Sequence, residues 1–413
     1  MAVDPPDEIS AQLLLDLAQA LHASAIPTDI VEERLRAGAA ALGIDAQFFT
    51  MQSFVAAALR GGGTRRLEMR RFPFDTHWNL AQANALLALA TALADGKVGA
   101  AAGQAELARI LHRKALYPHW LVALAWAVYG AAVGARVGGR WTEIAVAALV
   151  SLICAEIHFA GTTYRQVNLE KAFLAGALGS LAVFGLAIVL PPFDYPRALY
   201  GGISLLVPST IITIGVHELV SEELEAGTIR LVYGIVGFGL LGAGVAAAFS
   251  VAKLLGLEPP HATATGLPDL VVLGFIAMGG LALVFCLEGR REDVPWIVLA
   301  AVIAYGSEEL TRIVLGERGE PIVPAFVVGS AAFLYARLPG RSPITMILPG
   351  IRQLTPGFLA TSATFSLLHV RAGASAASFF GVVLLAIQLG IGITAAGLVF
   401  RRRAKTRLFR QGP

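Results

Sequence analysis

Charged residues are scarce in this chain: they make up 15% of its 413 residues, whereas apolar residues make up 56%. A soluble protein usually carries about a quarter charged residues, so the deficit predicts a lipid-facing surface. The only two cysteines, Cys154 and Cys286, lie within apolar runs, which argues against a disulfide framework. The net charge is only +3, and the arginines cluster beside apolar runs as membrane topology signals do. We therefore expect no nucleic-acid partner.

The sequence also lacks the signatures of secretion, nucleotide binding and cofactor chemistry. No basic stretch followed by an apolar core opens the chain, so no signal peptide is expected. Gly61-Gly62-Gly63 is followed by neither a helix start nor a lysine at P-loop spacing, which favours a turn over a phosphate site. The sequence shows no metal-ligand cluster and no nucleophile elbow. We expect no metal, no cofactor and no enzymatic activity.

Residues 1–117 mix charged and apolar residues as a soluble domain does, and we predict a small α+β cytoplasmic domain there. Leu13, Leu14, Leu17 and Leu21 recur at helical spacing and should form one buried stripe. The predicted elements are helices over 8–23, 28–42, 78–95 and 102–114, and strands over 44–59 and 67–72.

Beyond this domain the charged residues lie in short clusters between apolar segments. A membrane-spanning helix needs about 20 predominantly apolar residues. Ten segments are candidates: 119–139, 141–161, 172–192, 198–218, 229–252, 268–287, 294–315, 322–338, 344–368 and 374–400. Basic residues precede the first segment and fill the tail 401–413 after the last, so both termini are predicted to be cytoplasmic. The expected location is a bacterial inner membrane.

Two of these segments carry matching proline interruptions. The fourth contains Pro208-Ser209, and the ninth contains Pro349-Gly350 with Pro356-Gly357 soon after. An Ala-Gly loop and a long final segment follow each interruption. The first five segments, within 118–255, thus correspond to the last five, within 256–400. Because five is odd, the two halves must be inverted, and the predicted fold is a ten-helix membrane unit of two inverted five-helix repeats.

Proline removes a backbone donor and clashes with the preceding turn. Helix breaks at membrane depth are tolerated where protein or a water-filled cavity satisfies the freed groups. Interrupted helices at matching positions of inverted halves indicate the central site of a transporter. Simple kinks are the structural alternative. The candidate substrate-binding residues are Pro208, Ser209, Thr213, Pro349, Gly350, Arg352, Gln353, Pro356 and Gly357.

Several stretches of the chain resemble the threonine/serine exporter family, in the family's order. They are 24–43 in the N-terminal domain, 205–219 with Gly227 and Arg230, and the Pro349-Gly350 and Pro356-Gly357 pairs. The resemblance implies ten spans, a cytoplasmic N-terminal domain and efflux of small hydroxylated amino acids driven by the proton-motive force. The family's usual Pro-Gly is Pro208-Ser209 here, and an aspartate-containing stretch is His217-Glu218, so the substrate is left open.

Arg352 is an ionisable residue inside an apolar segment, which by default suggests a functional site. Its guanidinium can hold a substrate carboxylate with two hydrogen bonds. The alternatives are a snorkelling or structurally paired arginine and a carboxylate bound by free helix N-termini. For proton coupling the candidates are Glu156, ranked first, then His217 and Glu218, because burial raises a carboxylate pKa and histidine titrates near neutrality. A solvated or paired residue at the membrane edge is the alternative, most of all for His217 and Glu218.

A passive channel for small polar solutes is the alternative function. Glu308-Glu309 with Arg312, and Phe365 with His369, resemble part of the CAAX-type intramembrane protease pattern, but the Glu-Arg spacing is one residue short and the His-x-x-x-Asn is missing. The expected partners are a small amino acid, protons and the lipid bilayer. Assembly into a homo-oligomer is left open.

Overall fold

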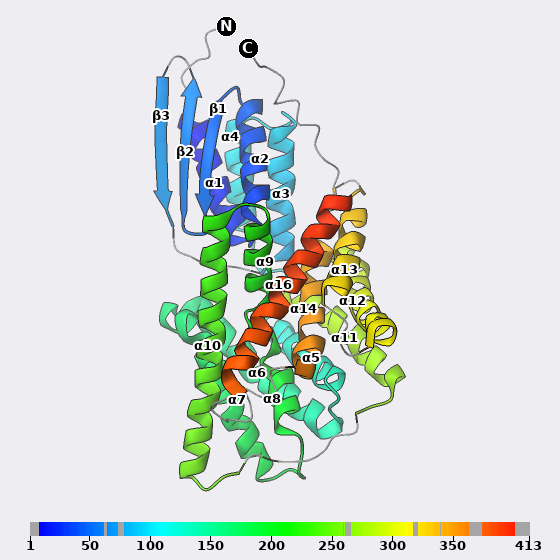
Figure 1. Cartoon of the computed structure of the whole chain (residues 1–413). Helices are drawn as coiled ribbons and strands as arrows, with labels where there is room; N and C mark the ends of the chain where they lie inside the picture. The colour runs from blue at the N-terminus through cyan, green and yellow to red at the C-terminus, as the bar shows by residue number, and fades with distance from the viewer. Residues whose placement is uncertain are drawn as a thin grey trace.

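The computed structural model describes residues 8–61, 64–72, 78–258, 260, 266–316, 321–338, 340–362 and 374–400. Two parts are stacked end to end (Figure 1). We call the part formed by residues 8–111 the N-terminal unit and the part formed by residues 119–400 the helical body.

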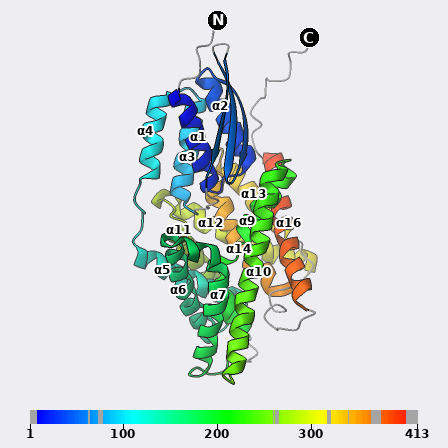
Figure 2. The ribbon, with the colours of Figure 1, turned by 90° about the vertical axis from the view of Figure 1, so that its left-hand side faces the viewer.

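The N-terminal unit packs helices on one face of a three-stranded sheet (Figure 2). Its elements are α1 (Glu8–Ala23), α2 (Thr28–Ala41), β1 (Asp45–Met51), β2 (Phe54–Gly61), β3 (Thr64–Arg71), α3 (Leu80–Ala94) and α4 (Ala100–Leu111). The strands are antiparallel in the order β1-β2-β3, with Ala56 opposite both Phe49 and Met69. The predicted stripe on α1 is confirmed, because its four leucines are fully buried in the core of the unit.

One predicted strand, 44–59, is wrong: it is a hairpin that reverses at Gln52-Ser53 between β1 and β2. Apolar residues continue on both sides of this turn, and it contains neither glycine nor proline, so the sequence carries no breaker there. Gly61 pairs with Thr64 across the second reversal, as the predicted turn requires. Gly62 and Gly63 themselves lie outside the described residues.

The helical body holds a helix in each of the ten predicted apolar segments, and in the fourth it holds a bent pair. Its elements are α5 (His119–Arg136), α6 (Trp141–Thr163), α7 (Arg165–Ala187), α8 (Tyr195–Ile203), η1 (Ser204–Leu206), α9 (Ser209–Val220), α10 (Leu224–Leu254), α11 (Asp269–Cys286), η2 (Arg291–Asp293), α12 (Val294–Leu315), α13 (Ile322–Tyr335), α14 (Ile344–Ser362) and α16 (Ala374–Phe400).

Within the described ranges, four helices are long and apolar enough to cross a membrane: α6, α10, α11 and residues Glu170–Ala187 of α7. A fifth span results if α8, η1 and α9 count as one segment, bent by 56°. The protein is therefore a membrane protein with several apolar helices.

Glycines bring pairs of helices into backbone contact. A Cβ atom on Gly176 of α7 would lie 2.2 Å from the carbonyl oxygen of Leu241 in α10. Likewise, a Cβ on Gly392 of α16 would lie 2.4 Å from the carbonyl oxygen of Ile322 in α13. Small residues at such crossings allow the close packing on which membrane helices depend. The third and fifth helices of each predicted half therefore pack on each other (Figure 1).

Candidate functional site

The predicted interruption in the fourth segment is confirmed. η1 ends at Leu206, α9 begins at Ser209, and Val207 between them is extended, with φ −64° and ψ 124°. A residue that precedes proline is driven out of the helical region by the proline ring, here that of Pro208. The chain direction consequently turns by 56°.

The break leaves the start of α9 polar and buried inside the helical body. Ser209, Thr210 and Thr213 are at most 3% exposed. Thr213 donates its hydroxyl to the carbonyl of Ser209 at 3.0 Å, whereas the buried Thr210 hydroxyl has no hydrogen-bond partner among the described residues. The first N–H groups of a helix also lack intrahelical acceptors and carry a partial positive charge. This end of α9 can therefore accept an anionic or hydroxylated ligand.

The predicted interruption of the ninth segment is wrong, because α14 runs without a break through Pro349-Gly350 and Pro356-Gly357. A proline at 356 cannot donate to the carbonyl of Arg352, four residues earlier. The Tyr129 hydroxyl donates to that carbonyl instead, at 2.7 Å. An outside donor thus satisfies the freed carbonyl and the helix can continue.

The structure brings Arg352 of α14 to the break before α9. Its Nη1 donates to the carbonyl of Leu205 at 2.7 Å, an acceptor that the N–H of Ser209 would use in a continuous helix. Its guanidinium also lies 5.5 Å from the centre of the Trp78 ring. Arg352 is 7% exposed and its Nε has no hydrogen-bond partner in the described part of the chain.

Arg352 also lacks a carboxylate partner: across the described ranges, no aspartate or glutamate lies within ion-pair distance of it. A buried charge is normally paired, because its desolvation is costly. The buried Arg136 and Arg230 follow this rule and pair with Glu308 and Glu218. Arg352 is the exception among these three, and its free hydrogen-bonding capacity suits a carboxylate.

The neighbours of Arg352 on α14 have simpler surroundings. Gln353 and Thr355 are buried, and Thr355 donates to the carbonyl of Ile351 at 2.9 Å. Gly350 leaves room for the side chain of Val328, because a Cβ atom at position 350 would lie 2.4 Å from a methyl carbon of that valine. Pro349, Pro356 and Gly357 lie in the same helix.

Glu156 lies apart from this group. Its carboxylate is 3.2 Å from Nε2 of His119, and both side chains are more than half exposed. His119 begins α5 and precedes Tyr129 by ten residues, which is about 15 Å along a helix. The structure therefore does not bring Glu156 to Arg352.

Glu218 and His217 join the helical body to the N-terminal unit. Glu218 is fully buried and pairs with Arg230 at 3.0 Å, and its other oxygen accepts from the backbone N–H and the hydroxyl of Thr28. Because Pro27 provides no side-chain cap, Glu218 caps α2 from the other part of the molecule. His217 contacts the Thr394 hydroxyl at 2.7 Å and lies 3.8 Å from Asp29.

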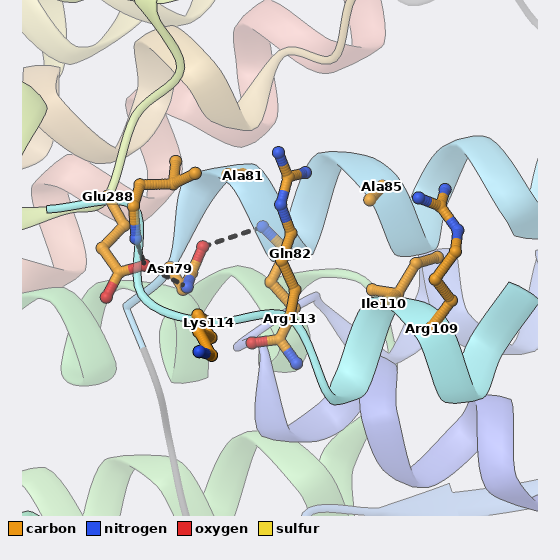
Figure 3. Close-up of a pocket in the computed structure, with 10 residues that line it drawn as sticks. Asn79, Ala81, Gln82, Ala85, Arg109, Ile110, Arg113, Lys114 and Glu288 are labelled. Carbon is orange, nitrogen blue, oxygen red and sulfur yellow. Dashed lines mark hydrogen bonds between the residues drawn. The ribbon is translucent and has the colours of Figure 1, made fainter.

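A second set of contacts joins the two parts at the start of α3. The N–H groups of Leu80 and Ala81 donate to the carbonyls of Leu287 and Glu288, at the end of α11. A small pocket lies beside this contact, and in Figure 3 the Asn79 amide points toward the Glu288 carboxylate, 2.8 Å away. The other polar residues lining the pocket are Gln82, Arg109, Arg113 and Lys114. It belongs to the joint and not to the Arg352 site.

The residues that resemble a protease pattern have structural partners. Glu308 pairs with Arg136, and Glu309 pairs with Arg312 one helical turn away. The Glu309–Arg312 pair is an ordinary stabilising contact within a helix, and the Glu308–Arg136 pair joins α12 to α5. Phe365 and His369 lie outside the described residues.

Sequence reasoning did not assign site roles to Trp78, Thr28, Tyr129 or Arg230. Arg230 carried a usable signal, because it is an ionisable residue inside an apolar segment, as Arg352 is. Trp78 and Thr28 lie more than 120 residues from their partners in the chain, and nothing in their own surroundings marks those contacts.

A sequence model of the family described as "Putative threonine/serine exporter" (ThrE) matches residues 12–252, more than half of the chain. The chain belongs to this family. The match to the exporter family spans the N-terminal unit, the break at Pro208 and the Glu218–Arg230 pair. Arg352 lies beyond it.

Relatives of this ThrE family member include several fungal proteins named pheromone-regulated membrane protein 10. The Candida albicans (SC5314) protein is 24% identical over an alignment covering 96% of this chain and 38% of the relative. The Saccharomyces cerevisiae (YJM789) protein is 22% identical, covering 92% and 52%, and the Eremothecium gossypii protein 23%, covering 86% and 49%. This chain thus spans about half or less of each relative's length. No solved structure matches it.

Proposed function

We propose that this protein is a secondary transporter that exports small amino acids resembling threonine or serine, driven by the proton-motive force. Membership of the exporter family supports the class of function. The observation that carries the proposal is Arg352, a buried guanidinium without a carboxylate partner among the described residues, held at the break before α9. A substrate carboxylate would supply the missing partner.

We propose further that the helical body consists of two inverted five-helix repeats. The contact pattern supports this arrangement, because α5 packs on α6 and α7 on α10 in the first half, as α11 packs on α12 and α13 on α16 in the second. The corresponding helices α5 and α11 also pack on each other. In this proposal the site lies between the halves, where transporters of this architecture bind their substrates.

The start of α9 would recognise the rest of the amino acid. Thr210 offers a buried hydroxyl without a partner in the described residues, close to the free N–H groups of the first turn. A substrate hydroxyl could satisfy it, and a site that hydrogen-bonds a hydroxyl rejects an analogue without one. We therefore propose a preference for hydroxylated over purely aliphatic side chains.

Proton coupling requires a titratable group whose surroundings change during transport. Glu156 is exposed beside His119 and distant from Arg352, whereas Glu218 is fully buried at the end of the helix that begins at the break. We therefore place Glu218, with neighbouring His217, ahead of Glu156 as the coupling group. In this proposal both termini are cytoplasmic and the membrane is the plasma membrane of a bacterium.

Flux in proteoliposomes tests the proposal. Purified protein is reconstituted into vesicles. The vesicles are loaded with labelled threonine or serine, and a pH gradient is imposed across their membrane. A proton-coupled carrier accumulates amino acid against its gradient, and collapse of the pH gradient with an ionophore abolishes the accumulation. Equilibration without accumulation, unaffected by the pH gradient, would instead support a passive channel.

A further inference from the structure

Trp78 reaches from the N-terminal unit into the helical body. Its ring lies over the Arg352 guanidinium at 5.5 Å, within the range of a cation–π contact. The side chain is half-buried and also packs against the cluster of Ile211, Ile212 and Ala386, on α9 and α16. Trp78 thus contacts both elements of the proposed site, α14 with its guanidinium and α9 with its free terminus.

Trp78 is held in place by the contacts at the start of α3. Leu80 and Ala81 donate to carbonyls at the end of α11, and the Asn84 amide donates to the Thr345 hydroxyl of α14 at 2.9 Å. Asn84 and Thr345 are both buried. We call these contacts the α3 latch. They fasten Trp78 to the second half of the helical body, the half that carries Arg352.

A second latch fastens the N-terminal unit to the first half. Arg230 donates to the carbonyl of Ile26 at 3.2 Å, and Glu218 accepts from Thr28. The N-terminal unit therefore bridges α9 and α10 on one side and α11 and α14 on the other (Figure 1). Alternating access moves the two halves of a transporter relative to each other, so one of the two latches must loosen during the cycle.

We propose that Trp78 closes the Arg352 site on the side of the N-terminal unit, and that this unit acts as a gate which withdraws Trp78 when the site opens to that side. The inference rests on the proposed function and adds to it the regulation of the same site. The substrate carboxylate and the Trp78 ring use the same guanidinium, so Trp78 must leave the approach to Arg352 before a carboxylate can enter from this side.

The test measures how fast a cysteine in the site reacts from each side of the membrane. The full-length chain carries Cys154→Ala, Cys286→Ala and Thr210→Cys, and sealed vesicles of known orientation are exposed to an anionic, membrane-impermeant methanethiosulfonate. When Trp78 is present, the introduced cysteine should react slowly with reagent added on the side of the N-terminal unit. Trp78→Ala should raise that rate about tenfold, which lies between the effects of losing an exposed and a desolvated cation–π contact, and leave the rate on the opposite side unchanged.

Matched variants control for indirect effects. Trp120→Ala makes the same substitution at a 68% exposed tryptophan at the start of α5 and should leave both rates unchanged. Trp78→Phe retains an aromatic ring, and the introduced cysteine should still react slowly in this variant. If Trp78→Ala does not fold, Asn84→Ala, which removes the side-chain contact of the α3 latch but retains Trp78, should still raise the rate on the same side.

Equal rates for Trp78→Ala and Trp120→Ala, or a rise on both sides of the membrane, would overturn the gate. Transport by the protein with the native Thr210 is measured separately. One-sided acceleration without any amino-acid transport would support the gate and reject the proposed substrate. Transport without one-sided acceleration would support the substrate and reject the gate.

Discussion

Pro208 lies between two helices, whereas Pro349 and Pro356 lie inside one, although all three stand in apolar segments that the sequence pattern matches with each other. The difference at Pro356 has a visible cause. The Tyr129 hydroxyl donates to the Arg352 carbonyl that Pro356 leaves free. At Pro208 the chain turns, so the N–H of Ser209 does not reach the carbonyl of Leu205, and that carbonyl accepts from the Arg352 side chain instead. A donor from α5 thus satisfies the carbonyl that Pro356 frees, and α14 continues past that proline.

The comparison also explains why the proposed site has two unlike parts. The first half contributes the start of α9, with its N–H groups and the Thr210 hydroxyl. The second half contributes the Arg352 guanidinium on an unbroken α14. In the proposed function, these two unlike parts would bind a carboxylate that has a polar neighbour.

The largest expected effect is on stability, at Glu218 near the C-terminal end of α9. Glu218→Ala leaves Arg230 buried without its carboxylate, which should lower the free energy of unfolding by about 3–5 kcal/mol. Glu309→Ala is the control, because Glu309 and Arg312 form a more exposed pair that contributes less than about 1 kcal/mol. Denaturant titration in detergent measures both. Equal losses would show that the Glu218–Arg230 pair does not stabilise this joint.

The explanation of the continuous α14 predicts a double-mutant cycle. Tyr129→Phe leaves the Arg352 carbonyl unsatisfied and should cost about 1–3 kcal/mol of unfolding free energy. In a Pro356→Ala background the residue at 356 can donate to that carbonyl, so the same Tyr129→Phe change should cost far less. The same denaturant titration measures the coupling. Additive effects would mean that Tyr129 does not substitute for the missing N–H.

The same substitution at two prolines tests the comparison directly. Pro208→Ala restores an N–H at the break, favours a straighter helix and should lower the transport rate about tenfold, which corresponds to about 1.4 kcal/mol. Pro349→Ala in the continuous helix should retain the rate. Initial rates in proteoliposomes, normalised to reconstituted protein, provide the measurement. A larger loss at Pro349 would invert the roles of the two segments.

The smallest expected effect is a pH dependence of stability that arises from His22 in the N-terminal unit. Burial, with a contribution from nearby Arg230, lowers the pKa of His22 to about 3. Between that value and about 6.5, the unfolded chain binds a proton that the folded chain does not, so stability falls as pH falls. The loss from pH 7 to pH 6 should be about 0.7 kcal/mol. His22→Leu should remove this slope, and an unchanged slope would exclude His22 as its source.

Much of the fold was predictable from the sequence because it depends on local patterns. Apolar run length located a helix in each of the ten segments, although among the described residues only four helices, or five with the bent pair, are long and apolar enough to cross a membrane. Helical spacing located the buried stripe of α1. The hairpin at Gln52-Ser53 was missed because no breaker residue marks it. The continuity of α14 was missed because it depends on a hydroxyl 223 residues away in the sequence.

The candidate site was predictable only in part. Arg352 and Pro208 are conspicuous in their own segments, and the structure places them together. Glu156 was the leading candidate for proton coupling as an acid in an apolar run, but its partner is His119 and both side chains are more than half exposed. Long-range contacts such as Trp78 with Arg352 require the fold, because no local pattern records which side chain covers another.

The central claim is that Arg352 binds the substrate carboxylate, and substrate competition tests it most directly. Transport of labelled threonine is measured in the wild type, Arg352→Lys and Arg352→Gln, with unlabelled threonine or its carboxyl amide as competitor. In the wild type only the free carboxylate should compete. Arg352→Gln should lower the apparent affinity for threonine at least about tenfold and abolish the discrimination, while Arg352→Lys retains part of it. Unchanged affinity and discrimination in Arg352→Gln would contradict the account.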